Sequence, residues 1–202
     1  EFAKEHGEAI EDFSVFANWC NHTTSLSNQS LEEEIAKHND ALLVKALDWS
    51  KAVNHGIETE LVGEDKPFEG VKSALEEISK VAQIAIVSSA NSEAVNSEWK
   101  RHGLMPFVSE FFGQERGSKA AAIKEIKSLG FEKEKILMVG DAPGDLDAAK
   151  VNEVHFYPIL FGKEKESWET LVTKILPEFI GGHYNDIEYQ AIYHNHLSQF
   201  KS

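Results

Sequence analysis

Three strand-to-helix junctions in the sequence carry groups that could bind an anion or a metal ion. At the first junction, Ser88, Ser89 and Ala90 follow an apolar run and precede a helical segment. Hydroxyl groups and free backbone amides therefore meet at the start of a helix, where an anion is readily bound. At the second junction, Lys119 places an amine at the start of another helix. This combination suggests that the two junctions bind an anion.

The third junction carries two acidic residues on a tight turn. Asp141 and Asp145 follow the apolar run 136–139 within Gly-Asp-Ala-Pro-Gly-Asp. Two carboxylates this close repel one another by about 1 kcal/mol in water, and by more when partly buried. We therefore expect either a divalent cation or the amine of Lys119 to neutralise them. Each residue taken singly is more often a helix cap or a solvated side chain, so the functional interpretation depends on all three junctions together.

Helices and strands alternate from residue 64 onward, and these elements must position the three junctions. Short apolar runs typical of buried strands occur at 81–87, 108–112, 136–139 and 154–159, with helical segments between them. The alternation predicts an α/β fold with a doubly wound parallel sheet. In such a sheet, ligands bind outside the carboxyl ends of the strands. We therefore expect the three junctions to share one edge of the sheet.

The first third of the chain has helical spacing and no strand pattern. Its clearest helix is predicted to begin at a capping box formed by Ser30 and Glu33 and to continue to Gly56. Near the other end, Ser167 is predicted to cap a helix that Pro177 limits. The predicted domains are a helical domain over 1–63, an α/β core over 64–181 and a C-terminal helical tail over 182–202.

Composition and charge exclude several classes of protein. The 202 residues are 42% hydrophobic and 27% charged, which is typical of a globular chain. The formal net charge of -14 argues against nucleic acid and against an anionic membrane surface as partners. Cys20 is the only cysteine, so no internal disulfide can form. The sequence has neither a secretory signal nor a run of 18 apolar residues, and we predict a cytoplasmic protein.

In these motifs the chain resembles the haloacid dehalogenase-like superfamily, in particular its phosphatases with a small helical cap. The segment from Ile84 to Ser88 resembles the second motif of that superfamily, and Lys119 resembles the third. The segment from Ile136 through Asp145 resembles the acidic fourth motif, Gly-Asp-x-x-x-Asp. The resemblance covers about residues 67–158. It implies a Rossmann-type core, with the helical first third as a cap that selects the substrate.

The resemblance also implies a reaction: the magnesium-dependent hydrolysis of small phosphorylated metabolites. In the superfamily, a nucleophilic aspartate forms an aspartyl phosphate, a second aspartate protonates the leaving oxygen, and water hydrolyses the intermediate. Lys119 would balance charge on the nucleophile and the phosphoryl oxygens. The remaining expected roles are phosphate binding by Ser88 with the backbone amides of Ser89 or Ala90, ligation of magnesium by Asp141, and a role for Asp145 as a further ligand or as its partner.

The chain departs from the superfamily at the first motif, Asp-x-Asp after an apolar strand. The acidic residues near the start, Glu5, Glu11 and Asp12, lie in a charged stretch of helical character with no preceding strand. In the superfamily, the missing strand lies between the strands that here end at Ser88 and Asp141. Because the chain also begins with a residue other than Met, we expect the nucleophile upstream of this sequence. We expect the 202-residue form to be inactive without it.

Two other interpretations remain open from the sequence. A dehalogenase could use the same scaffold, although halide displacement does not require the metal that Asp141 and Asp145 favour. A non-catalytic relative could instead bind a phosphorylated ligand or a protein partner through the cap.

Overall fold

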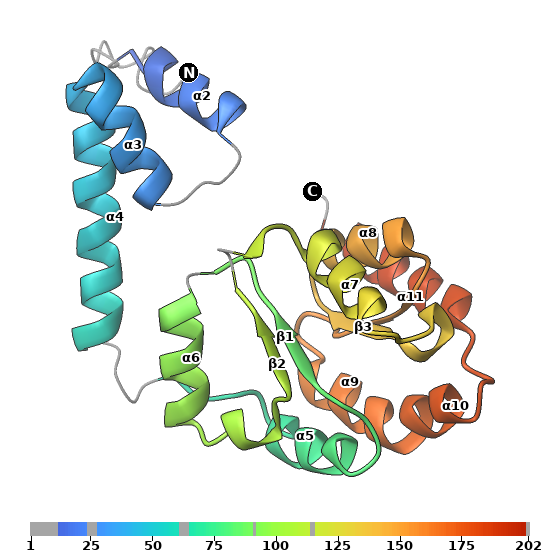
Figure 1. Cartoon of the computed structure of the whole chain (residues 1–202). Coiled ribbons are helices and arrows are strands. Elements are labelled where there is room, and N and C mark those ends of the chain that lie inside the picture. Colours follow the sequence, from blue (N-terminus) through green and yellow to red (C-terminus); the bar gives the residue numbers. More distant parts are fainter. Residues whose placement is uncertain (1–11, 24–27, 61–64, 91, 114–115, 201–202) are drawn as a thin grey trace. The chain divides into compact units, whose positions relative to one another are not determined.

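The structure is a computed structural model that describes residues 12–23, 28–60, 65–90, 92–113 and 116–200. The chain divides into two compact units, Glu1–Asp65 and Lys66–Ser202. We call them the helical unit and the core unit, and Figure 1 shows the elements of each.

In the described part of the helical unit, three helices pack around a small apolar core. Trp19 comes from the first helix, Leu31 from the second, and Leu43 and Leu47 from the third, and all four side chains are buried. The indole N–H of Trp19 donates a hydrogen bond of 3.1 Å to Ser30 Oγ, so its polar atom is satisfied beside the core. The helices are α2 (Ser14–His22), α3 (Asn28–His38) and α4 (Ala41–Glu60).

The single helix predicted from Ser30 to Gly56 is wrong, because the chain breaks it into α3 and α4. Asn39 adopts a left-handed conformation with φ of 46° between the two helices. Asp40 then accepts a hydrogen bond of 2.8 Å from the backbone N–H of Leu42 and caps α4. Ser30 lies inside α3 rather than at its N-cap. The spacing of apolar residues did not reveal the break, because it continues through both helices.

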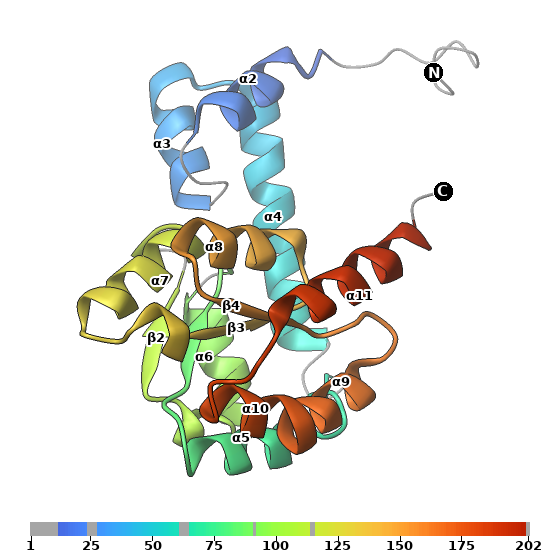
Figure 2. The ribbon, with the colours of Figure 1, turned by 90° about the vertical axis from the view of Figure 1, so that its right-hand side faces the viewer.

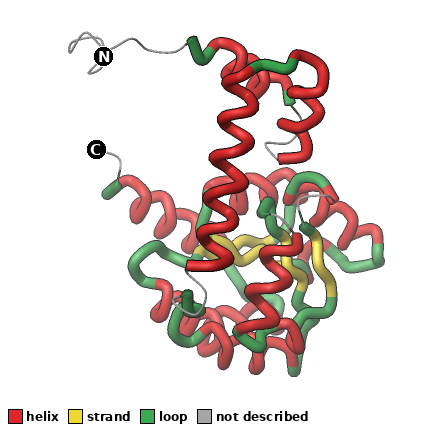
Figure 3. The backbone as a smooth tube through the Cα atoms, turned by 90° about the vertical axis from the view of Figure 1, so that its left-hand side faces the viewer, coloured by secondary structure: helices red, strands yellow, loops and turns green. Residues whose placement is uncertain are grey.

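The core unit alternates between helices and short strands, and Figure 3 shows the strands in yellow among the red helices of this unit. None of the described helices is long and apolar enough to cross a membrane. The strands are β1 (Ala85–Val87), β2 (Glu110–Phe112), β3 (Leu137–Gly140) and β4 (His155–Pro158). The helices are α5 (Val71–Ser79), α6 (Ser92–Arg101), η1 (Met105–Phe107), α7 (Lys119–Ser128), η3 (Lys133–Lys135), α8 (Pro143–Asn152), α9 (Glu164–Thr170), η4 (Leu171–Ile175), α10 (Leu176–Ile180) and α11 (Asp186–Ser198).

All strand pairs are parallel, as the alternation of helix and strand predicts, but they form two separate sheets. β1 pairs with β2, with Ala85 opposite Glu110. β3 pairs with β4, with Leu137 opposite His155. The α/β class with parallel strands is therefore confirmed, while the sheet is divided.

Helices cover both faces of the β3–β4 sheet, as Figure 2 shows with α8 on one side and α9 and α10 on the other. Side chains alternate between the faces because successive residues of a strand point in opposite directions. One face places Met138 and Phe156 against α7, α8 and α11. The other places Leu137, Val139 and Tyr157 against α5, α9 and η4. The strands thus form the middle layer of an α/β/α arrangement.

Within the described ranges, β1 and β3 each pair with a strand along one edge only. Directly after β1, the N–H of Ser88 donates a hydrogen bond of 2.9 Å to the carbonyl of Phe112 in β2. The alternate residues Ala85 and Val87 therefore direct their backbone groups to the opposite edge. In β3, the carbonyl of Gly140 likewise faces the β4 side. Among the described residues, no further strand pairs with the free edge of β1 or of β3.

The helix predicted to begin at Ser167 and to stop at Pro177 has different limits. Ser167 lies within α9, where its hydroxyl accepts the N–H of Leu160 and donates to the carbonyl of Lys163. The chain continues through the π-helical turn η4 into α10, and Pro177 lies in the first turn of that helix. A proline is tolerated there because the first-turn N–H groups have no partner within their helix.

We expect Phe156→Ala to lower the free energy of unfolding by about 3–5 kcal/mol, because its ring is fully buried between α8 and α11. Phe68→Ala is the control, since Phe68 is 60% exposed, and it should cost less than about 1 kcal/mol. Urea unfolding followed by circular dichroism measures both. Equal losses in the two variants would contradict this account of the core.

Candidate active site

An ion pair joins two helices at the carboxyl end of β3. Lys119 begins α7 and Asp145 lies in the first turn of α8, and Lys119 Nζ donates to Asp145 Oδ1. The Lys119 side chain is 26% exposed and that of Asp145 is 3% exposed. Of the two ways expected to neutralise the acidic turn, the structure shows the amine. Because Asp145 is buried, its negative charge would be costly without the positive charge of Lys119 beside it.

The second oxygen of Asp145 closes the acidic turn on itself. Oδ2 accepts the backbone N–H of Ala142 at 3.0 Å, and the N–H of Asp145 donates to the carbonyl of Ala142 at 2.9 Å. The carboxylate also lies directly against Gly140, where a Cβ atom would overlap it. Only glycine leaves room at that position. Both oxygens of Asp145 are therefore engaged within the protein.

Asp141 lies on the same turn, and its side chain is exposed. Its backbone carbonyl accepts a hydrogen bond of 2.6 Å from the hydroxyl of Tyr193, a buried residue of α11. Burial, followed by the charges of Asp145 and Asp141, raises the pKa of Tyr193 to about 12. The hydroxyl therefore stays protonated and keeps donating at neutral pH. α11 thus holds the backbone of the turn while the Asp141 carboxylate faces solvent.

Asn152 fixes the first turn of α7 beside α8. Its side-chain amide donates to the carbonyl of Ala120 at 3.0 Å and to that of Ala148 at 2.9 Å, and the residue is buried. Lys127 donates to the Asn152 carbonyl at 2.8 Å. Because Ala120 follows Lys119 directly, these bonds hold the amine near Asp145.

Asn152 and Tyr193 were not among the residues predicted for the site, and nothing in their spacing marks them. The hydrogen bond of Tyr193 joins residues that are 52 positions apart in the chain, and that of Asn152 to Ala120 joins residues 32 positions apart. A buried tyrosine or asparagine needs such a partner, but the sequence does not say which one.

Ser88 lies at the end of β1, in the other sheet. Its Oγ accepts the N–H of Ala90 at 3.1 Å, which forms a local turn, and both Ser89 and Ala90 are exposed. Among the described residues, no hydrogen bond joins Ser88 to Lys119 or to either acidic residue of the turn. Asn91, the next residue of the predicted anion cradle, lies outside the described residues.

The chemistry of the acidic turn fits a magnesium ion at Asp141. Magnesium prefers hard oxygen ligands, commonly one or two carboxylates with water and phosphate oxygens. Asp141 offers an exposed carboxylate, whereas both oxygens of Asp145 already accept hydrogen bonds. In this arrangement Asp141 would hold the ion, and Asp145 would keep the turn in place.

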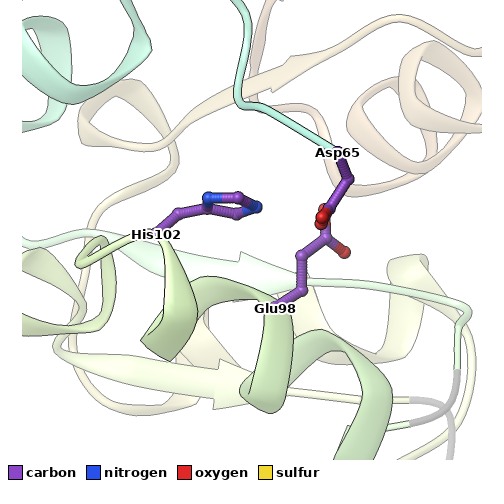
Figure 4. Close-up of side chains that lie close together, drawn as sticks. All are labelled: Asp65, Glu98 and His102. Carbon is purple, nitrogen blue, oxygen red and sulfur yellow. The ribbon is translucent and has the colours of Figure 1, made fainter. Parts of the chain in front are cut away.

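A second set of titratable side chains lies at the end of α6. Figure 4 shows Glu98 and His102 about one turn apart. Asp65, also labelled there, is the last residue of the helical unit. Magnesium prefers oxygen ligands, and one of these two side chains is an imidazole, so we assign no magnesium site to this pair.

Comparison with known proteins gives one family and a fold. The sequence model of haloacid dehalogenase-like hydrolases matches residues 8–159. A solved hydrolase of the haloacid dehalogenase-like family from Streptococcus pneumoniae has a TM-score of 0.52 and 16% identity, and the match covers 85% of this chain and 79% of that one. A HAD-superfamily hydrolase of subfamily IA, variant 1, from Geobacter sulfurreducens has a TM-score of 0.46 and 18% identity, with 65% and 79% covered. Identities this low indicate the fold alone. No curated protein is significantly similar in sequence.

The close approach of Asp145 to Gly140 can be tested with two glycines of the same loop. We expect Gly140→Ala to lower the free energy of unfolding by about 1–3 kcal/mol, because the new methyl group must displace the carboxylate. In Gly144→Ala the new methyl group meets no atom within 4 Å, and alanine favours the helix. That control should be neutral or stabilising by up to about 1 kcal/mol. If the two variants unfold at the same denaturant concentration, the packing described here is incorrect.

The strength of the Lys119–Asp145 pair can be measured by a double-mutant cycle with Lys119→Met and Asp145→Asn. We expect a coupling energy of about 1–3 kcal/mol, because Asp145 is buried and its charge has little access to water. The comparison is the pair of Lys135 and Glu132, at 3.1 Å and more than two-thirds exposed. The coupling there should stay below about 1 kcal/mol. Equal coupling in both cycles would show that burial adds nothing to the site.

Proposed function

Since the chain belongs to the haloacid dehalogenase-like hydrolase family, we propose that it is a magnesium-dependent phosphatase of small phosphorylated metabolites. The observation that supports this most directly is the buried ion pair of Lys119 and Asp145 beside the exposed carboxylate of Asp141. An ammonium group and an exposed carboxylate thus lie at the carboxyl end of β3, where α/β proteins bind their ligands.

Charge is the first requirement of this reaction. The chain carries a formal charge of -14, which opposes a phosphorylated substrate at long range. Local cations must therefore reverse the potential at the site. Lys119 supplies one positive charge, and a magnesium ion held by Asp141 would supply two more. Stabilising charge on the transferring group is most of the catalytic work in phosphoryl transfer.

The chain's own residues then have separate tasks. Lys119 binds the phosphoryl oxygens with its remaining N–H groups while Asp145 holds its position. Tyr193 and Asn152 act as positioning residues, because one fixes the Asp141 backbone and the other fixes the first turn of α7. Ser88, at the end of β1, donates a hydrogen bond from its hydroxyl group to the phosphoryl group.

The nucleophile is proposed to be an aspartate on a strand outside the described residues, parallel to β1 and β3. Its carboxylate attacks phosphorus and the bond from phosphorus to the ester oxygen breaks. A second aspartate, two residues on, gives its proton to the departing oxygen, which leaves as an alcohol. The same aspartate then takes a proton from water, which hydrolyses the aspartyl phosphate and releases inorganic phosphate.

A non-catalytic relative that binds a phosphorylated ligand is the second candidate. The observation in its favour is that, among the described residues, no further strand pairs with the free edge of β1 or of β3. Such a protein would use Lys119 and the end of β1 to bind phosphate without turnover.

The two candidate functions predict different results when the strand that carries the nucleophile is added as a peptide. We expect the 202-residue chain alone not to hydrolyse p-nitrophenyl phosphate. A synthetic peptide of about ten residues, with an apolar β-branched run followed by Asp-x-Asp-Val, should bind and produce magnesium-dependent hydrolysis. The same peptide with Asn in place of the first Asp should bind without turnover. Isothermal titration calorimetry measures binding, and p-nitrophenol release measures activity.

Variants of the chain complete the test. Asp141→Asn should reduce the restored activity at least about a hundredfold, because it removes the proposed metal ligand. Asp147→Asn is the matched control, an exposed acid of α8 on which the proposal places no role. A peptide that binds but restores no hydrolysis of any phosphate ester would favour the non-catalytic relative. Hydrolysis by the chain alone would contradict the proposed origin of the nucleophile.

A further inference from the structure

An apolar stripe runs along one side of α4, and most of it lies outside the core of the helical unit. At about 100° per residue, Leu42, Ala46, Trp49, Val53 and Ile57 fall within an arc of about 80°. The buried core residues of α4, Leu43 and Leu47, lie outside this arc, and of the stripe only Ala46 packs against that core. Along it, Trp49 is 71% exposed, Val53 39% and Ile57 53%. A tryptophan this exposed on an apolar stripe is typical of a surface that binds another protein.

The N-terminal half of this stripe forms one wall of a groove, and α2 supplies the other wall. Phe13 and Phe16 face Leu42, Ala46 and Trp49 across a hollow of about 300 Å³. Phe13 is itself 53% exposed. All of these residues belong to the helical unit, so the groove is a feature of that unit alone.

Acidic residues adjoin the groove. A second hollow of about 260 Å³ shares Leu42 and Lys45 with the first and is lined by Asp12 and Asp40. Lys45 is the only cation among the described lining residues of the two hollows. The apolar groove thus continues into a second hollow that is lined by two carboxylates.

The negative charge of the chain is concentrated in the same unit. Residues 1–65 contain 14 of the 34 acidic residues and 4 of the 20 Lys and Arg residues. The helical unit therefore carries a formal charge of -10, and residues 66–202 carry -4. A field of this sign selects cationic partners.

We propose that the groove between α2 and α4 binds a basic amphipathic helix of a partner protein. Apolar side chains of that helix at positions i, i+3, i+4 and i+7 enter the groove and cover Trp49 and Phe13. Its lysine and arginine side chains face the carboxylates of Asp12 and Asp40. A second copy of this chain is a poor occupant, because it would bring another charge of -10 to the same surface. An anionic lipid surface is repelled for the same reason.

The proposal does not depend on the phosphatase reaction, and its test measures binding. The probe is a fluorescein-labelled helical peptide with leucine at positions i, i+3, i+4 and i+7 and lysine elsewhere, titrated with the full 202-residue chain and followed by fluorescence anisotropy. We expect Trp49→Ala to weaken binding at least about tenfold, because truncation of an aromatic anchor commonly has this effect. Raising the NaCl concentration from about 50 mM to about 500 mM should weaken it to a similar extent.

Matched controls separate this groove from general attraction to an acidic protein. Phe161→Ala removes an exposed aromatic ring from the core unit, at 68% exposure, and should leave the affinity unchanged. A peptide with the same leucines but glutamate in place of lysine should not bind. Because Trp49 and Phe161 are both exposed, neither truncation should unfold the chain, and circular dichroism checks this.

Three outcomes would overturn the proposal. The first is equal affinity of the lysine peptide for the parent chain and for Trp49→Ala. The second is equal binding of the lysine and glutamate peptides. The third is a dimer in analytical ultracentrifugation that Trp49→Ala abolishes, which would make a second copy the occupant.

Discussion

The candidate site depends on one interaction, the buried ion pair between Lys119 and Asp145. Asp145 is almost fully withdrawn from water, so without the amine its charge would be very costly to keep there. The pair links the first turns of α7 and α8, and Asp145 also binds the backbone of the turn that carries Asp141. Through this pair, a single carboxylate sets the position of the ammonium group and of the exposed acid beside it.

The supporting residues come from distant parts of the chain, and this makes the site a property of the whole core unit. Asn152 ties α7 to α8, and Tyr193 of α11 holds the backbone of Asp141. Tyr193 also belongs to the apolar cluster on one face of the β3–β4 sheet. Packing of the core and placement of the acidic turn are therefore coupled, because the same buried ring serves both. The core unit is less complete on the side of β1, where Ser88 ends a short strand whose opposite edge has no described partner.

The two units differ in charge and therefore in the partners that they can attract. The core unit is nearly balanced, with 16 Lys and Arg residues against 20 acidic residues, whereas the helical unit holds most of the net negative charge. An anionic substrate would be repelled by the helical unit at long range and bound only by local cations. A cationic protein segment would be attracted to the helical unit, where an apolar groove adjoins acidic side chains. Ligands of opposite charge would then bind to different surfaces of the same chain.

The sequence by itself determined the α/β class, the parallel direction of the strands and the identity of the acidic turn, because these follow from local periodicity and from residue types at strand ends. It also indicated that Lys119 could neutralise that turn. Only the tertiary structure decided that Lys119 pairs with Asp145 and leaves Asp141 open, since this depends on how α7 packs on α8. It alone showed the break at Asn39, which leaves the apolar spacing unchanged, and the contacts of Asn152 and Tyr193. Such contacts join residues far apart in the chain, and no local pattern encodes which buried polar atoms will meet.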